Sequence, residues 1–185
     1  MSIVGTAKVS NVKMSLDKYV NDNTGTSEGL SIDFEGVPFD NTANTEWIQP
    51  RILDFGSTYN RQGSSTEYAE SVDVFYNINI FVKKSGVTTS HRHYAIRDIV
   101  ADYFKIGQDI YLRNYAEGGT TQIAKIRVRD LVTDSPIPET NEYLQYALAY
   151  NINWTRLTLE ASDLTPDPTI LWTSDVSWGS GIVWN

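Results

Sequence analysis

Few residues in this chain of 185 are spaced in a way that supports catalysis or metal binding. His91 and His93 stand two residues apart, and on a strand their imidazoles would share one face and could hold a metal ion. Their segment precedes or opens a helix, however, and no nearby Asp, Glu or Cys completes a set of ligands. We therefore expect both imidazoles at a solvated helix N-terminus, and we expect no metal site.

Other reactive residue types occur without the arrangement that an enzyme needs. No Gly-x-Ser-x-Gly elbow supports a Ser/His/Asp triad, and Gly179-Ser180-Gly181 is better interpreted as a turn. Neither a phosphate-binding P-loop nor a dinucleotide fingerprint occurs. Asp33 and Glu35 would share a strand face, but two acids are ordinary in a chain with 23 Asp and Glu. We expect no catalysis and no cofactor.

The charge balance and composition favour an assembly role. Fifteen Lys and Arg face 23 Asp and Glu, and the net charge of −8 argues against a free-standing binder of duplex DNA. The absence of cysteine excludes a disulfide scaffold, thiolate metal ligands and a cysteine nucleophile. The chain has 11 Tyr and 5 Trp, residue types that are enriched at protein–protein interfaces. No apolar run approaches the length of a membrane span and no signal peptide is visible, so no membrane contact is expected.

Hydrophobic periodicity predicts an α+β domain over residues 1–160, followed by an extended C-terminal arm over 161–185. The domain is expected to hold a mixed, mainly antiparallel sheet with long strands. An N-terminal helix and a central helix are expected to pack on that sheet.

The first helix is predicted from residue 3 to about 20, with a turn-rich stop at 21–29. The central helix is predicted between Ser90 as its N-cap and a stop at Gly107. Its apolar residues follow the helical period and should all be buried against the sheet: Ile96, Ile99, Val100, Tyr103 and Phe104.

Six strands are predicted from alternating apolar and polar residues. They span 30–34, 46–55, 68–83, 109–115, 121–132 and 142–159. Pro50 lies inside the second strand and implies an interruption, a bulge or a sheet edge, and a proline-containing loop is expected at 134–139. The two longest strands extend to about 50 Å. Such a length suggests either a sheet that continues beyond its own domain onto a neighbour or a strongly bent or bulged sheet.

A short basic stripe lies on the fifth predicted strand. Lys125, Arg127 and Arg129 alternate with apolar residues and should line one face. A positive stripe of this kind suits either a phosphate backbone or acidic residues on a neighbouring strand or subunit. The negative net charge of the chain favours the second interpretation, which makes these residues candidates for an interface.

The C-terminal arm has a composition of its own. It contains no Lys or Arg, and Pro166 and Pro168 mark a linker ahead of a small repeat that places Trp172, Trp178 and Trp184 six residues apart. An extended arm presents all three indoles on one side, whereas turns at the spacers would stack three short strands. The indoles pack either on their own domain or on another chain. We predict that the arm docks on a neighbouring chain as a strand added to a sheet edge, with alternate side chains in pockets.

Three short motifs in the first third of the chain resemble the tail terminator (tail completion) proteins of tailed bacteriophages. The motifs are Ile32-Asp33-Phe34-Glu35-Gly36-Val37-Pro38-Phe39, Glu46-Trp47-Ile48-Gln49-Pro50-Arg51 and Arg61-Gln62-Gly63. In that family an N-terminal helix leads to a Pro-Phe turn, a Trp/Tyr-containing strand, an Arg-x-Gly turn and a long strand followed by a helix. The resemblance covers roughly residues 1–158, and the Trp repeat is not part of the family pattern.

This resemblance implies a structural virion protein without catalysis. It implies an α+β subunit that assembles into a hexameric ring on the head-proximal end of the tail tube. The ring stops polymerisation of the tail tube protein and presents a surface to the head–tail connector or neck protein. DNA passes through the lumen without sequence-specific binding, and the ring is assembled in the host cytoplasm.

Two further hypotheses stay open beside the tail terminator. The chain is alternatively another tail or head–tail joining component, such as a tube or completion protein. A hypothesis that agrees less well with the motifs is a soluble β-rich binding module or an enzyme whose motif is not recognised. A closed ring that caps tubes distinguishes the first hypothesis from a tube protein, which would form open-ended stacks.

Overall fold

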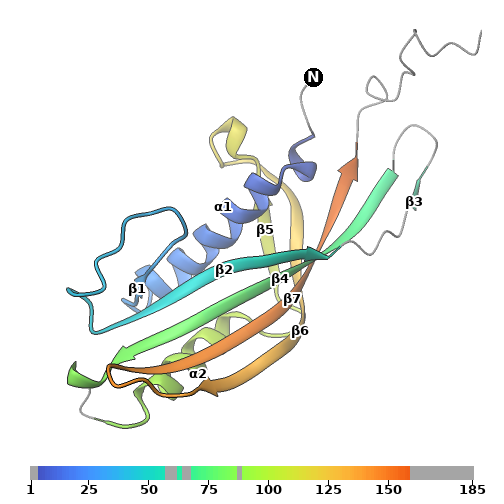
Figure 1. Ribbon diagram of the computed structural model, residues 1–185. Coiled ribbons are helices and arrows are strands. Elements are labelled where there is room, and N and C mark those ends of the chain that lie inside the picture. Colours follow the sequence, from blue (N-terminus) through green and yellow to red (C-terminus); the bar gives the residue numbers. More distant parts are fainter. Residues whose placement is uncertain (1–3, 57–61, 64–67, 87–88, 159–185) are drawn as a thin grey trace, which may run out of the picture.

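The computed structural model describes residues 4–56, 62–63, 68–86 and 89–158, which fold as two helices packed on one sheet (Figure 1). The sheet has the order β1-β2-β4-β7-β6-β5, and β3 pairs with β4 beside this path. The strands are β1 (Ser31–Ile32), β2 (Glu46–Gly56), β3 (Gln62–Gly63), β4 (Tyr68–Lys83), β5 (Asp109–Arg113), β6 (Gln122–Ile137) and β7 (Tyr143–Thr158). The helices are α1 (Val9–Val20) and α2 (Arg92–Tyr103), with a π-helical turn η2 (Asn21–Thr26) after α1 and short 3-10 turns η1 (Gly5–Ala7), η3 (Lys84–Gly86) and η4 (Tyr115–Glu117). The predicted α+β class is confirmed, and the predicted arm lies outside the described residues.

The centre of the sheet is the long antiparallel pair of β4 and β7. The two strands keep one register from Tyr68 opposite Thr158 to Lys83 opposite Tyr143 without a bulge. The predicted alternation on both strands is confirmed, because one face of each is buried throughout. The buried residues are Val72, Val74, Tyr76, Ile78, Ile80 and Val82 on β4, and Leu144, Tyr146, Leu148, Tyr150, Ile152 and Trp154 on β7. These side chains form the core under both helices.

Strand β6 is longer than the sequence predicts, and the loop expected at 134–139 is wrong over residues 134–137, which belong to the strand. The strand continues to Ile137 and includes Pro136, which lies opposite Tyr146 of β7. Strand β5 pairs with β6 only up to Arg127, so the later part of β6 has no second neighbour among the described strands. A proline is tolerated at such an edge because no ladder hydrogen bond requires its missing N–H. Two register shifts, at Val128/Asp130 and Leu131/Thr133, bend this edge.

The other edge of the sheet is also irregular. The strand predicted at 30–34 shrinks to β1, which runs parallel to β2 and pairs only with Trp47 and Ile48. Pro50 pairs with Ile78 of β4 just beyond this contact, and the register of β2 shifts between Ile52 and Asp54. The prediction of a bulge or an edge at this strand is therefore confirmed.

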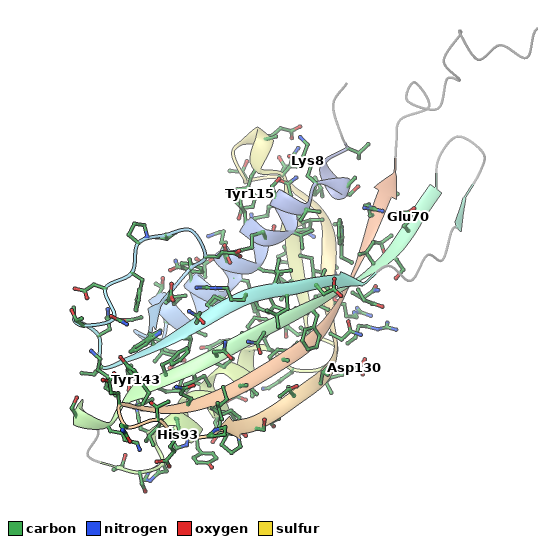
Figure 2. All side chains as sticks on the ribbon, viewed as in Figure 1. Lys8, Glu70, His93, Tyr115, Asp130 and Tyr143 are labelled. Atoms are coloured by element: carbon green, nitrogen blue, oxygen red, sulfur yellow. The ribbon has the colours of Figure 1, made fainter. Side chains whose placement is uncertain are left out.

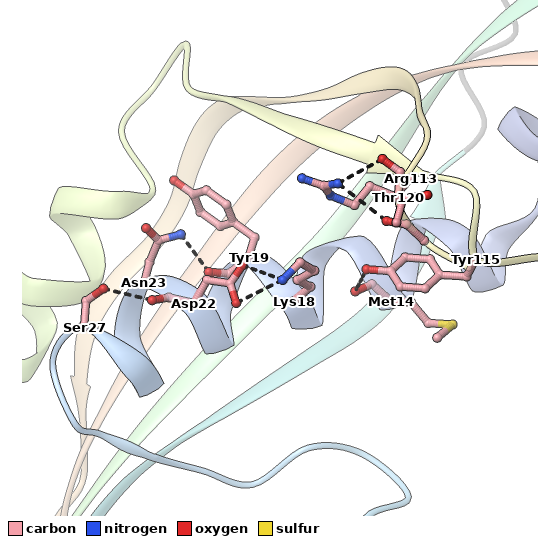
Figure 3. Close-up of polar contacts among 10 residues, drawn as sticks. Met14, Lys18, Tyr19, Asp22, Asn23, Ser27, Arg113, Tyr115 and Thr120 are labelled. Carbon is pink, nitrogen blue, oxygen red and sulfur yellow. Dashed lines mark hydrogen bonds and ion pairs between the residues drawn. The ribbon is translucent and has the colours of Figure 1, made fainter. Parts of the chain in front are cut away.

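Helix α1 buries Val12, Leu16 and Val20. It ends at Val20, as predicted, but it begins at Val9 rather than at residue 3, and the winding continues through the predicted stop as η2. The Asn23 amide donates to the Tyr19 carbonyl at 2.8 Å (Figure 3). The Thr24 hydroxyl donates to the carbonyl of Val20, four residues before it. These side-chain bonds satisfy carbonyls at the helix end and carry the winding past residues of low helical propensity.

Helix α2 packs its apolar side on β4 and β7. Ile96, Val100 and Phe104 are buried, whereas Ile99 and Tyr103 are only partly buried at the margin of the core. The predicted packing of this side of α2 on the sheet is therefore confirmed, with Ile99 and Tyr103 less deeply buried than the other three residues. The N-cap is His91, not Ser90, and no side chain caps the helix.

Candidate functional site

The face of the sheet opposite the helices is the candidate functional surface. Both helices contribute to one core with the buried face of β4 and β7, and in Figure 1 they lie behind these strands. The cross-strand register assigns the residues of the other face, which we call the open face. They are Trp47, Gln49 and Arg51 on β2, Phe75, Asn77, Asn79 and Phe81 on β4, and Tyr143, Gln145, Ala147, Ala149 and Asn151 on β7.

The middle of the open face combines carboxamides with alanines. Asn77 lies opposite Ala149, and Asn79 lies opposite Ala147. Gln49 of β2 flanks Asn79 on its other side. Carboxamides both donate and accept hydrogen bonds, whereas Ala147 is half-buried and Ala149 is covered by its neighbours. This region is therefore suited to contact with a peptide segment rather than to proton transfer.

One end of the open face is aromatic. The rings of Trp47 and Phe81 are stacked, with centroids 5.2 Å apart and an angle of 11° between their planes. Tyr143 meets Trp47 edge to face at 5.6 Å, and Phe39 of the loop before β2 approaches it at 5.8 Å. These four rings form the aromatic cluster, and the pairs have the geometries that aromatic rings prefer.

The aromatic cluster lines a pocket of about 390 Å³ together with Asp33, Asn41 and Gln49. The Gln49 amide donates to Asp33 Oδ2 at 2.7 Å, and Arg51 forms an ion pair with the same oxygen at 3.3 Å. Asp33 is thus held by two partners, whereas Glu35 is exposed, so the two acids do not form a catalytic pair. Aromatic walls beside carbonyl and carboxylate oxygens suit a flat side chain that carries an N–H donor.

The predicted basic stripe is divided by the first bulge of β6. Lys125 Nζ lies 3.0 Å from Asp109 Oδ2, and Arg127 Nε donates to Asp109 Oδ1 at 2.7 Å. Hydrogen bonds from Arg127 and then Lys125 lower the pKa of Asp109 to about 2. These two cations therefore pair with an acid on the neighbouring strand, as the sequence favoured. Arg129 is exposed like Lys125 and Arg127, as the predicted alternation requires, but it falls within the register shift of β6. The role of these three residues in an interface stays a prediction.

The two histidines have different surroundings. His91 is exposed, but His93 is buried, against the expectation of a solvated pair. The His93 ring centroid lies 4.2 Å from that of Tyr94 and 6.4 Å from that of Tyr146. Burial lowers the pKa of His93, and Glu139 opposes the shift. Figure 2 shows His93 near the same end of the sheet as Tyr143, with Glu70 at the opposite end.

Within the described residues, no group of three or more His, Cys, Asp or Glu side chains is arranged to hold a metal ion. None of the helices in this part of the chain is long and apolar enough to cross a membrane. Trp172, Trp178 and Trp184 lie outside the described residues, so the predicted contacts of the arm stay predictions.

Sequence reasoning missed the open face and the pocket, although part of the signal was present. Phe39 and Trp47 both belong to the motifs that resemble tail terminators, and here they meet in the aromatic cluster. Phe75 and Phe81 alternate with asparagines on the strand face that was not assigned to the core. The second face of β4 combines phenylalanines with asparagines, and this mixture of apolar and amide side chains was the indication of a contact surface.

Comparisons with known proteins identify no family. No family model and no curated protein matches the chain. A solved structure of a protein without a functional name aligns over 78% of this chain and 95% of its own, with a TM-score of 0.48 and 13% identity. A similarity at this level carries no functional assignment.

Proposed function

We propose that this protein is a structural subunit of a bacteriophage tail, which forms a hexameric ring on the head-proximal end of the tail tube. The ring ends polymerisation of the tail tube protein and joins the tail to the head–tail connector. The protein acts by binding alone, needs no cofactor and belongs to the finished virion.

The observation that carries the proposal is the open face. Three long strands present carboxamides, alanines and an aromatic cluster on the side away from both helices. Large aromatic rings beside half-exposed side-chain amides that donate and accept hydrogen bonds are typical of protein–protein contacts. The resemblance of the motifs around Phe39 and Trp47 to tail terminators supports the choice among assembly proteins.

The irregular edges of the sheet also support an assembly in which subunits contact one another through the faces of their sheets. The free part of β6 carries two bulges and Pro136, and the partner of β2 at the other edge is only two residues long. Bulges and prolines hinder the endless edge-to-edge pairing of strands. Subunits that meet through a different patch on each partner form either a closed ring or an open filament, depending on the rotation between them. A terminator requires the closed form.

The test is the assembly state of the full chain, alone and with tail tube protein. We expect light scattering after size-exclusion chromatography to give a closed oligomer, and negative-stain images to show rings that cap one end of each tube and stop its growth. Open-ended stacks would instead indicate a tube protein, and a monodisperse monomer that ignores tubes would indicate a binding module.

Two variants sharpen this test. Deleting residues 165–185 should leave the circular dichroism spectrum nearly unchanged and weaken ring formation. His91→Ala, at an exposed position on the helix side, should leave ring formation intact. Loss of assembly in a folded His91→Ala protein would reopen a catalytic or metal-binding role.

A further inference from the structure

We propose that the C-terminal arm docks on the open face of a neighbouring copy of this chain, rather than at a sheet edge as its spacing alone predicted, with consecutive tryptophans seated over Phe75 and Phe81. The identity of the neighbour as a ring subunit rests on the proposed function. The surface that receives the arm is argued from the described residues below.

The first argument is a match of spacing. Trp172, Trp178 and Trp184 recur every six residues. Phe75 and Phe81 are also six residues apart, on the same strand and on the same face. Six extended residues span about 20 Å in either segment. An arm laid along β4 therefore brings two indoles onto two phenylalanine rings at once, in either direction.

The second argument is the chemistry between these two rings. Asn77 and Asn79 stand between them, beside Ala149 and Ala147 of β7. The spacers of the arm, which include Thr173, Ser174 and Ser177, bring hydroxyls and peptide groups. Carboxamides pair with either kind of group without requiring a charge.

The third argument is the pocket beside Phe81. Its walls are the rings of the aromatic cluster, and Asp33 and Asn41 supply oxygen acceptors at its margin. An indole is flat and carries one N–H that donates only, so it is satisfied by one acceptor at the end of an apolar slot. The carboxylate of Asp33 retains acceptor capacity beyond its contacts with Gln49 and Arg51.

The length of the arm is sufficient. It adds 27 residues after Thr158, which lies opposite Tyr68 at the end of β4. The 13 residues between Thr158 and Trp172 span up to about 43 Å when extended. Pro166 and Pro168 in this spacer favour an extended path away from the parent sheet over a return along it. The arm thus reaches a neighbour that stands beside the end of β7.

The experiment uses the absence of cysteine from the chain, which makes every engineered thiol unique. Val176→Cys lies between Trp172 and Trp178 and on the same side of an extended arm. Asn79→Cys lies between Phe75 and Phe81 on the open face. The two single variants are purified separately, mixed so that their subunits exchange, and treated with a short bismaleimide. Ser10→Cys, an exposed and nearly isosteric change on α1, replaces Asn79→Cys in the matched control.

A cross-linked dimer with Asn79→Cys and its loss with Ser10→Cys would support the proposal. Equal cross-linking at both positions, or none at either, would overturn it. In a double variant with both thiols on one chain, a product that stays monomeric would overturn docking on the neighbour. Rings that cap tubes without the cross-link refute this inference alone, whereas the cross-link without rings refutes the proposed function alone.

Discussion

Two tyrosines in the core have buried hydroxyls, and we predict that removing either hydroxyl stabilises the protein. Tyr76 of β4 and Tyr150 of β7 lie opposite each other, and the Phe104 ring stacks on both, with centroids 5.8 and 5.2 Å away. Both hydroxyls are buried, and neither has a hydrogen-bond partner among the described residues. Burial raises the pKa of both phenols, so they stay neutral at ordinary pH.

Removing either hydroxyl should therefore stabilise the protein. A buried hydroxyl without a partner costs about 1–3 kcal/mol of desolvation. Removing the oxygen leaves a space on the order of 10 Å³. At about 24 cal/mol per Å³ of cavity, this space destabilises the folded protein by only about 0.2 kcal/mol. Tyr76→Phe and Tyr150→Phe should each raise the free energy of unfolding by about 1–2 kcal/mol.

Urea unfolding followed by circular dichroism measures this change. Tyr146→Phe is the matched control, because its buried ring carries a hydroxyl that donates to Asp134 at 2.8 Å. That variant should lose about 0.5–1.5 kcal/mol. If Tyr76→Phe and Tyr150→Phe lose as much as the control, their hydroxyls have hydrogen-bond partners and the reasoning is refuted.

Two other predictions concern α2. Because the pKa of buried His93 is lowered in the folded protein, the unfolded chain binds more protons as the pH falls. The contribution of neutral His93 to stability is therefore fully present above the pKa of histidine in the unfolded chain, about 6.5, and is lost as the pH drops below it. His93→Gln should flatten this slope in urea midpoints measured from about pH 8 to about pH 5, and His91→Gln should keep it; an unchanged slope in the first variant would contradict the assignment. Ile96→Ala should cost about 2–5 kcal/mol in the same assay because Ile96 is fully buried, and Ile99→Ala should cost less. Equal losses would show that the core-facing side of the helix is wrongly assigned.

The central strands were predictable because their pattern is long and unambiguous. Alternation over 16 residues admits only an extended chain with one buried face, so β4 was predicted with its observed bounds and β7 to within one residue at each end. A run of this length averages out single residues of poor propensity.

The errors occurred where one residue was taken as a local stop signal. Pro136 indicated a loop, but an edge position removes the penalty that this signal assumes. Asn21 and Gly25 indicated the end of α1 at Val20 correctly, but they did not indicate the π-helical turn that side-chain bonds from Asn23 and Thr24 support beyond it. Both outcomes depend on partners that a local pattern does not specify.

The candidate surface was harder to predict than the strands. Alternation reveals that β4 has two faces but not that both helices pack on the same one, which leaves the other open. The contact of Phe39 with Trp47 depends on how the intervening loop folds. The likeness of these motifs to tail terminators and the docking of the Trp repeat stay predictions, because neither lies within what the described residues or the comparisons test.

The sheet order has a consequence for synthesis on the ribosome. The main partner of β4 is β7, the last strand of the described residues. The Trp154 indole donates to the carbonyl of Thr6, near the other end of the described chain, at 2.8 Å. The apolar faces of α1 and β4 therefore emerge long before the residues that cover them. Contacts so distant in sequence slow folding and leave nascent chains exposed to aggregation. A product that terminates before residue 143 lacks the central pairing of β4 with β7 and should be removed by host chaperones and proteases.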